Sequence, residues 1–256
     1  MSTPGSMSVA TRAPLSPSGL RERNRAFYDR LWDTARLVRP ERLNTWPLIR
    51  SLLAMHPRRL EVAPGLRPRL PLDGTVFVDL SRPALHQLAR RGARALQSEI
   101  ARLPFAEGTF DLVCALDVLE HIENDRAGLG ELCRVGAPGA VLLLSVPLHP
   151  AHWTAFDDWV GHWRRYEPAE LLRLLQSHGL RVRQSAAYGM QPRSSRLLDY
   201  GRWWLTHHPQ HAMWWYNRVL MPLGALFQRP LAFSPGWVDN TLDVDEVILV
   251  CTREQA

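Results

Sequence analysis

The chain has 256 residues, of which 46% are hydrophobic and 22% charged, and its formal net charge is +6. This balance is typical of an ordinary globular protein with one substantial core, and the weak positive charge permits an anionic substrate or a membrane surface as partner. A zinc protein is disfavoured because the cysteines show no CxxC or Cys/His zinc spacing. A secreted protein and a membrane-spanning protein are disfavoured as well, because the N-terminus has no apolar core of signal-peptide length and no apolar run reaches about 20 residues. We therefore expect a cytoplasmic protein with buried free thiols among Cys114, Cys133 and Cys251.

The N-terminal residues 1–18 are predicted to form a disordered tail, and residues 19–256 a single domain. Two amphipathic helices are expected next, at about 20–38 and 46–55. The apolar face of the first helix consists of Phe27, Leu31, Ala35 and Val38.

From residue 59 onward, apolar strand-like runs alternate with helix patterns. Strands are expected at 59–62, 75–80, 95–99, 110–119, 140–147, 181–188 and 245–253. Helices are expected from Ser81 to near Gly92, at 125–135 and at 167–180, each followed or ended by a glycine. Continuous apolar strands joined by helices predict an α/β fold: a Rossmann-like, doubly wound, mostly parallel sheet of seven strands with helices on both faces.

Acidic residues stand where the predicted strands end. They are Glu61, Asp79, Glu99 and Asp117. Ligands of doubly wound sheets bind beyond the carboxyl ends of the strands, so these carboxylates are candidate ligand contacts. A dinucleotide is disfavoured as the ligand, because the turn after the first strand lacks the Gly-x-Gly-x-x-Gly pattern.

Four stretches occur in a familiar order and spacing: "RLEVAPG", "FVDLSRPAL", "LPFAEGTFDLVCALDVLEHI" and "LCRVGAPGAVLLLSVP". Together they resemble the class I S-adenosylmethionine-dependent methyltransferases, in the type 11 group that includes quinone-biosynthesis enzymes. The resemblance covers about residues 55–185. It implies N-terminal helices at 19–57, a cofactor-binding half at 58–147, a substrate-facing half at 148–256, and S-adenosyl-L-methionine as cofactor.

The resemblance also assigns a role in cofactor binding to the turn after the first strand. The family has an acid and then Gly-x-Gly-x-Gly, whereas this chain has Glu61 followed by Ala63, Gly65 and Arg67. A ligand backbone approaches closely only where side chains are small, so Ala63 is a mild departure. Arg67 is a large one, and its guanidinium is expected near the methionine carboxylate of the cofactor. The alternative is a pocket that no longer binds cofactor.

Further cofactor contacts follow from the same resemblance. Asp79 would accept both ribose hydroxyls, with Leu80 beside it, although Asp79 or Ser81 could instead cap the following helix. The adenine amino group would meet Glu99 and the ring Ile100, unless Glu99 is only a surface residue. Two residues would line the pocket near the transferred methyl group, Leu116 and Asp117.

Methyl transfer itself asks little of the protein, because positioning supplies much of the rate. A general base is needed only where the acceptor must lose a proton, and histidine titrates in the suitable range.

"GHWRRY" resembles a Gly-His-x-Arg-x-Tyr segment of related bacterial methyltransferases, which makes His162 the leading base; His121 and Tyr166 are further candidates. Arg165 and Tyr166 could also hold an acidic substrate group or close a lid. The alternative is a packing cluster, and no metal is expected. Weaker candidates are His149 and His152.

The stretch 201–227 is rich in tryptophan. Three interpretations remain open: a substrate lid with an aromatic pocket, a peripheral contact with the inner face of the membrane, and core or dimer packing. The first two imply a hydrophobic or lipid-like acceptor.

The leading function is methylation of a small-molecule or lipid-like acceptor at oxygen, carbon or nitrogen. Alternatives are a catalytically silent binding or scaffold protein and, third, a nucleic-acid methyltransferase.

Overall fold

The computed structural model describes residues 17–189, 200–201, 203–204, 207–238 and 244–254. The expected N-terminal tail falls almost wholly outside these residues, and the first helix begins at Pro17. Within the described residues, none of the helices is both long enough and apolar enough to cross a bilayer.

The centre of the molecule is an eight-stranded sheet in the order β3-β2-β1-β4-β5-β8-β6-β7. Its strands are β1 (Arg59–Val62), β2 (Thr75–Asp79), β3 (Arg94–Gln97), β4 (Phe110–Leu116), β5 (Gly136–Pro147), β6 (Leu180–Tyr188), β7 (Ser234–Pro235) and β8 (Glu246–Arg253). The first five strands pair in parallel, and β8 lies antiparallel between β5 and β6. The seven predicted strands are confirmed, and the two-residue strand β7 adds an eighth.

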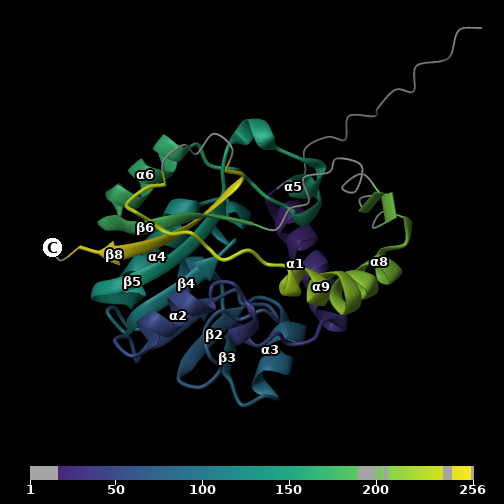
Figure 1. Ribbon diagram of the computed structural model, residues 1–256, viewed down its shortest axis with the longest axis horizontal. Helices are drawn as coiled ribbons and strands as arrows, with labels where there is room; N and C mark the ends of the chain where they lie inside the picture. Colours follow the sequence, from purple (N-terminus) through teal and green to yellow (C-terminus); the bar gives the residue numbers. More distant parts are fainter. Residues whose placement is uncertain (1–16, 190–199, 202, 205–206, 239–243, 255–256) are drawn as a thin grey trace, which may run out of the picture.

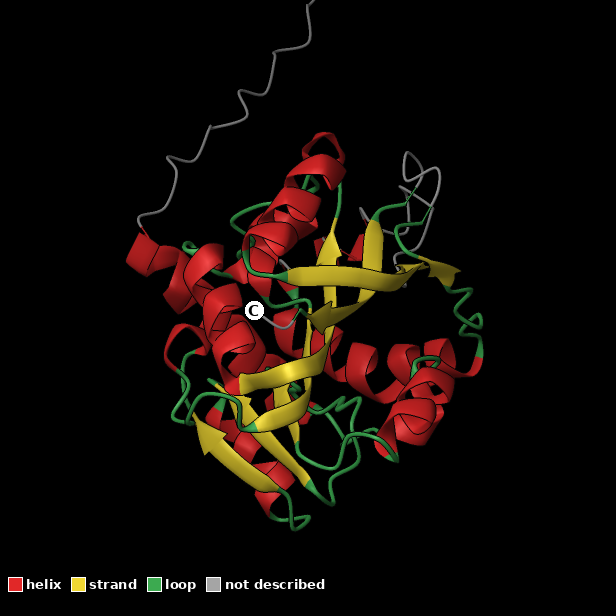
Figure 2. Ribbon diagram, turned by 90° about the vertical axis from the view of Figure 1, so that its left-hand side faces the viewer, coloured by secondary structure: helices red, strands yellow, loops and turns green. Residues whose placement is uncertain are grey.

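Helices cover both faces of this sheet (Figures 1 and 2). They are α1 (Pro17–Thr34), α2 (Trp46–Leu53), α3 (Arg82–Ala89), α4 (Asp125–Val135), α5 (Ala155–Val160), α6 (Pro168–Ser177), α8 (Pro209–Trp215) and α9 (Met221–Leu226). Short one-turn segments are η1 (Pro40–Arg42), η2 (Ile100–Arg102), η3 (Leu119–His121), η4 (Pro150–His152) and η5 (Tyr216–Leu220), of which η5 is a π-helix.

Alternate residues of the central strands face opposite layers, as a doubly covered parallel sheet requires. In β4, Val113 and Ala115 pack in the core beneath α4 and α6, whereas Leu112 and Cys114 pack against Ile49 of α2. On the side of α1 and α3, a third cluster joins the two helices to the strands. The three cysteines are free and buried, as predicted.

Helix α1 is shorter than its amphipathic pattern predicts, because it ends at Thr34 rather than near Val38. The backbone N–H of Val38 instead donates to the carbonyl of Leu66 at 2.9 Å. Pro40 follows two residues later, and a residue before proline is driven out of helical geometry. This turn brings the end of α1 against the loop that follows β1.

Candidate functional site

Four carboxylates lie at the carboxyl edge of the parallel strands. Glu61 is near the end of β1, Asp79 ends β2 and Asp117 follows β4, as the sequence predicts. Glu246 joins them because β8 runs antiparallel and pairs its first residue with Pro147, the last residue of β5. Glu246 was not predicted from the sequence. The feature that could have indicated it is an acidic residue at the start of the last strand, which would have to be recognised as antiparallel.

The turn after β1 has the backbone that a glycine-rich loop would have. Ala63 has φ 54° and Gly65 has φ 53°, both in the left-handed region. Alanine there costs on the order of 1–2 kcal/mol, and the bond from the Ala63 N–H to the Val78 carbonyl at 2.7 Å helps to hold it. The replacement of glycine by Ala63 therefore leaves the shape of the turn intact.

Asp79 ties this turn to the start of α3. Its Oδ2 accepts from the Gly65 N–H at 3.0 Å, and its Oδ1 accepts from the Ser81 N–H at 2.8 Å. Burial raises the pKa of Asp79 to about 6. Ser81 stands at the N-cap, but its hydroxyl donates a hydrogen bond to Asp29 Oδ1, so its side chain does not cap α3.

Trp32 of α1 lies directly on Gly65. A β-carbon added at Gly65 would stand 2.1 Å from Cζ2 of the indole, so only glycine fits against this ring. Tyr28, one turn earlier in the same helix, stacks on Trp32 with ring centroids 6.0 Å apart. The close approach that the sequence analysis assigned to a cofactor is thus made at Gly65 by a residue of the protein.

Glu61 is buried and braces the loop that follows. Its carboxylate accepts from the N–H groups of Arg69 at 2.8 Å and Leu70 at 2.9 Å. Burial raises its pKa to about 7, although these two hydrogen bonds oppose the shift. The acid of the first turn therefore shapes the loop from within.

Arg67 contacts aromatic side chains of α1 and η5. Its guanidinium lies over the rings of Trp32 and Tyr216, 5.3 and 5.2 Å from their centroids. It also donates to the Tyr216 hydroxyl at 3.3 Å and to Asn217 Oδ1 at 3.4 Å. Because aromatic faces attract a guanidinium, these contacts of Arg67 join the end of α1 to η5.

The interior beside Asp117 is acidic and incompletely hydrogen-bonded. Asp117 has φ 55° and accepts from Ser145 Oγ at 2.5 Å. Burial, Asp117 and Glu120 together raise the pKa of Glu246 well above its usual range, and Asp117 shares a hydrogen bond with it. Within the described part of the chain, Glu120 Oε2 and Glu246 Oε1 are buried without a hydrogen-bond partner. Buried acceptors left open in this way fit a ligand that brings positive charge and hydrogen-bond donors.

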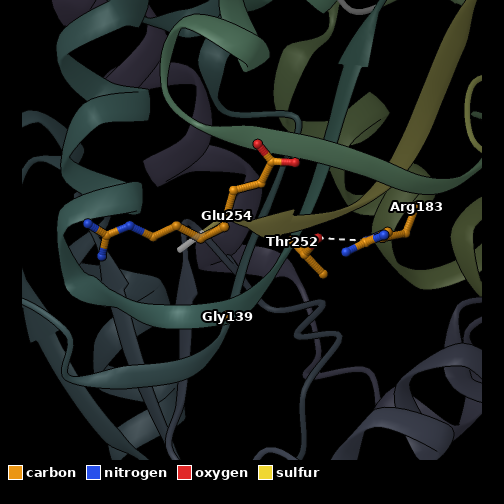
Figure 3. Close-up of a pocket in the computed structure, with 5 residues that line it drawn as sticks. Gly139, Arg183, Thr252 and Glu254 are labelled. Carbon is orange, nitrogen blue, oxygen red and sulfur yellow. Dashed lines mark hydrogen bonds between the residues drawn. The ribbon is translucent and has the colours of Figure 1, made fainter. Parts of the chain in front are cut away.

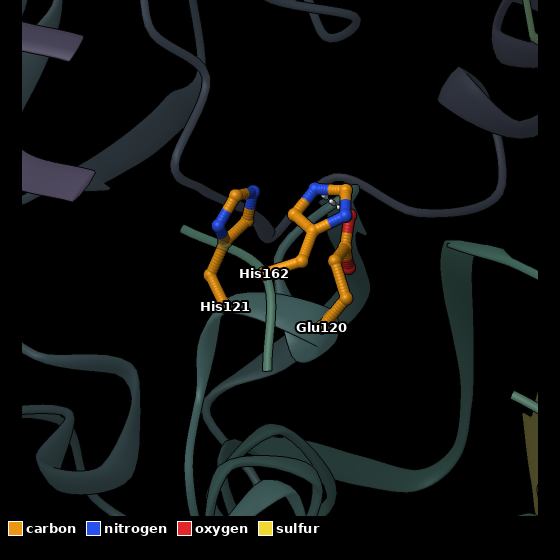
Figure 4. A group of neighbouring side chains, drawn as sticks. All are labelled: Glu120, His121 and His162. Atoms are coloured by element: carbon orange, nitrogen blue, oxygen red, sulfur yellow. Dashed lines mark ion pairs between the residues drawn. The ribbon is translucent and has the colours of Figure 1, made fainter. Parts of the chain in front are cut away.

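A second cluster adjoins this interior and consists of Glu120, His121 and His162 (Figure 4). Nδ1 of His162 lies 2.8 Å from Asp157 Oδ1, and its Nε2 lies 4.0 Å from Glu120 Oε1. Although burial opposes it, hydrogen bonds from His162 and Arg165 hold the pKa of Asp157 well below its usual range. Asp157, which the sequence analysis did not single out, therefore stays ionised and fixes the His162 proton on Nδ1.

The potential ligand atoms of Glu120, His121 and His162 lie within 4.8 Å of one another, a grouping that sequence spacing did not reveal. Nδ1 of His121 accepts from Asn24 at 2.7 Å, so its proton sits on Nε2, facing the Tyr28 hydroxyl at 3.3 Å. Burial and His162 lower the pKa of His121 well below its usual range. Both ring nitrogens of His121 therefore have hydrogen-bond partners within the protein.

Arg165 and Tyr166 are both hydrogen-bonded within the protein, as the packing-cluster alternative expects. Arg165 is buried and pairs with Asp157 through Nε at 2.9 Å. The Tyr166 hydroxyl donates to Asp125 Oδ2 at 2.9 Å, at the start of α4, and burial raises its pKa. Both side chains pack the segment that carries His162.

The remaining predicted contacts lie along the same edge of the sheet. Leu116 is half-buried at the end of β4, and Leu80 is exposed after β2. Glu99 is exposed and precedes η2, whereas Ile100 is buried in the core against α4. Of the weaker histidines, His152 pairs with Asp245 through Nδ1 at 2.8 Å, and its ring lies 5.0 Å from that of His149.

Two surface hollows lie at the opposite edge of the sheet. One, of about 460 Å³, is lined by Gly139, Arg183, Thr252, Arg253 and Glu254 (Figure 3). The other, of about 430 Å³, lies between α6 and β6. Both are at the amino ends of the parallel strands, whereas ligands of this fold bind at the carboxyl ends, so neither is the candidate site.

Comparison with known proteins places this geometry in context. A methyltransferase domain family matches residues 66–144. A demethylmenaquinone methyltransferase of Corynebacterium urealyticum is 30% identical over 120 residues, which is 40% of this chain and 52% of that protein. Norajmaline N-methyltransferase of Rauvolfia serpentina is 40% identical over 42 residues, 16% of this chain and 14% of that protein. The chain thus spans about half the length, or less, of these curated relatives.

Solved structures show the same fold. Phosphoethanolamine N-methyltransferase 2 of Haemonchus contortus, in complex with phosphomonomethylethanolamine and S-adenosylhomocysteine, superposes with a TM-score of 0.56 at 14% identity. The superposition covers 94% of this chain and 61% of that one. At this identity the likeness concerns the fold alone.

Proposed function

We propose that this chain, a member of the class I S-adenosylmethionine-dependent methyltransferases, transfers a methyl group to a small, lipid-like acceptor. The observation that carries the proposal is the acidic interior around Asp117, where Glu120 and Glu246 each leave an oxygen unpaired within the described residues. A ligand with a sulfonium and an ammonium group would neutralise such a site. The relatives named for demethylmenaquinone and norajmaline support a small organic acceptor.

Bound S-adenosylmethionine supplies an activated methyl group, so the acceptor needs chiefly to be held in line with it. Asp79 is the residue to hold the ribose, because it ends β2 at the carboxyl edge of the sheet and its backbone partners at Gly65 and Ser81 fix the orientation of its carboxylate. Asp117, Glu120 and Glu246 surround the place for the cationic end of the ligand; burial raises the pKa of Glu120 and Glu246, and a bound cation would draw both toward their ionised form.

His162 is the group that could take a proton from the acceptor. Asp157 holds its Nδ1–H, which leaves the lone pair of Nε2 directed toward the acidic interior beside Glu120. When Nε2 takes a proton, the adjacent Asp157 carboxylate stabilises the resulting imidazolium. This step matters for a phenol, an alcohol or an acidic carbon, and is unnecessary for an amine that is already neutral.

A second candidate is a catalytically silent binding protein. The contact of Trp32 with Gly65 favours it, because an aromatic ring takes the place where a cofactor backbone was expected. The two candidates differ in their effect on a labelled cofactor. Only the active protein moves the methyl group.

The test incubates the purified protein with methyl-labelled S-adenosylmethionine and an extract of its source, and identifies labelled products by mass. The proposal predicts label in an apolar small molecule, and loss of that label in the Asp79→Ala variant. Label that appears only in nucleic acid, or no label from a protein that binds the cofactor, would contradict it. The second of these results would favour the silent alternative.

A further inference from the structure

The segment 207–230, here called the C-terminal arm, consists of α8, η5 and α9 and lies beside α1 (Figure 1). Its inner side is fixed to the body of the protein. Asn217 donates through Nδ2 to the Leu31 carbonyl at 2.7 Å and to Thr34 Oγ1 at 2.9 Å. Met213 packs in the cluster that contains Trp32. The arm therefore presents a defined outer face.

That outer face is strongly apolar. Its large exposed side chains are Trp214, Trp215, Tyr216, Leu220, Leu223, Leu226 and Phe227. Leu226 and Phe227, at the tip, are 78% and 80% exposed. A contiguous apolar surface of this kind marks a place where the protein meets another apolar phase. The simple core-packing interpretation of this stretch is therefore wrong for its outer side.

The charges of the arm favour an anionic partner. Residues 200–238 contain no aspartate or glutamate, while Arg218 and Arg229 lie in the arm. Tryptophan and tyrosine flanked by arginine and leucine match the boundary between lipid headgroups and acyl chains. A second copy that docked through the same face would bring arginines against arginines with no acid between them, which disfavours a symmetric dimer.

We propose that the outer face of the C-terminal arm seats the protein on an anionic lipid bilayer. Leu226 and Phe227 enter the acyl boundary, the indoles lie at headgroup level, and the exposed Arg229 faces the anionic headgroups, whereas Arg218 donates to the Thr34 carbonyl of α1 at 3.1 Å. The arm is joined to the turn after β1 by Arg67, so a seated arm lies next to the candidate site. Bilayer binding requires neither cofactor nor acceptor, and therefore stands independently of the proposed methyl transfer.

The test measures flotation of the full chain with vesicles of phosphatidylcholine alone or mixed equally with phosphatidylglycerol. The proposal predicts binding to the mixed vesicles that weakens about tenfold or more in the double variant Leu226→Ser/Phe227→Ser. A matched control is Met55→Ser, which removes a side chain that is 77% exposed after α2 and should leave binding unchanged. Arg229→Gln should reduce the preference for the anionic vesicles, as should added salt.

Three results would overturn the proposal. They are an absence of vesicle binding by the parent protein, equal losses in the double variant and in Met55→Ser, and a concentration-dependent dimer that the double variant abolishes. The last result, measured by sedimentation without lipid, would assign the face to a second copy of the chain. Because cofactor binding is measured without vesicles, its failure and the failure of bilayer binding are separate outcomes.

Discussion

Ala63 and Arg67 both stand where the resemblance leads one to expect glycine, yet they differ in effect. Ala63 adopts the left-handed backbone itself, with φ 54°, so the departure is absorbed in the main chain. Arg67 directs its side chain to Trp32 and Tyr216. Neither residue by itself removes the candidate site, and the residue whose chemistry the site depends on most is Asp79.

Asp79 makes cofactor affinity depend on pH. Its pKa is raised to about 6, and only the ionised carboxylate accepts two hydroxyl groups freely. The dissociation constant for S-adenosylhomocysteine should therefore fall about tenfold as the pH rises from 5 to 7. In Asp79→Asn, binding should be at least tenfold weaker and lose this slope. Titration calorimetry at several pH values checks both, with Glu107→Gln, a substitution at the exposed surface, as control.

His162 should control the rate rather than cofactor affinity. His162→Gln is expected to lower kcat about 10²-fold for an acceptor that loses a proton, because Nε2 is the available base. The acid limb of the pH–rate profile should disappear, while affinity for S-adenosylhomocysteine stays within twofold. His152→Gln is the matched control, since His152 pairs with Asp245 at the surface. Equal effects of the two substitutions, or an unchanged pH profile, would remove His162 from this role.

At the scale of elements, α1 is the part that departs most from expectation. Leu31 of the expected apolar face is buried, but Trp32, which lies outside that face, covers the turn after β1, with Tyr28 stacked on it. The helix thus acts as a cover on the first turn of the sheet. Its coupling to that turn is measurable.

Gly65→Ala should destabilise the protein by about 2–4 kcal/mol. The new β-carbon would meet the Trp32 ring, and alanine is strained at φ 53°. Trp32→Ala should relieve most of the clash, so the double variant should lose less free energy of unfolding than the sum of the two single variants. Gly92→Ala is the control: its φ is +83° with nothing within 4 Å, and it should cost about 1 kcal/mol. Urea unfolding gives these values; additive losses would show that Trp32 and Gly65 are uncoupled.

At the scale of the whole molecule, local patterns predicted the strands, most helices and the edge where acids gather. They did so because apolar periodicity and helix caps are properties of neighbouring residues. Contacts between distant segments were not predictable in this way. Trp32 meets Gly65, Arg67 meets Tyr216, and Glu246 meets Asp117 only after the sheet has formed. Asp157 was missed because its partner histidine lies across a helix end rather than in a recognisable motif.

Buried acids should also tune global stability. The folded state binds a proton at Glu61 more tightly than the unfolded chain does, since burial raises this pKa from 4.5 to about 7. The free energy of unfolding should therefore fall as the pH rises from about 4.5 to 7, by up to about 3 kcal/mol from this residue. Glu61→Gln should flatten that slope in urea unfolding measured at pH 5, 6 and 7. An unchanged slope would show that Glu61 is ionised in the folded protein throughout.

The central claim is that the acidic edge of the sheet binds an adenosyl ligand even though its first turn is poor in glycine. Titration calorimetry of the folded protein with S-adenosylmethionine and S-adenosylhomocysteine tests it most directly. We predict one saturable site per chain, with a dissociation constant on the order of micromolar, that Asp79→Ala abolishes. Folded protein that binds neither ligand at about 1 mM would contradict the account.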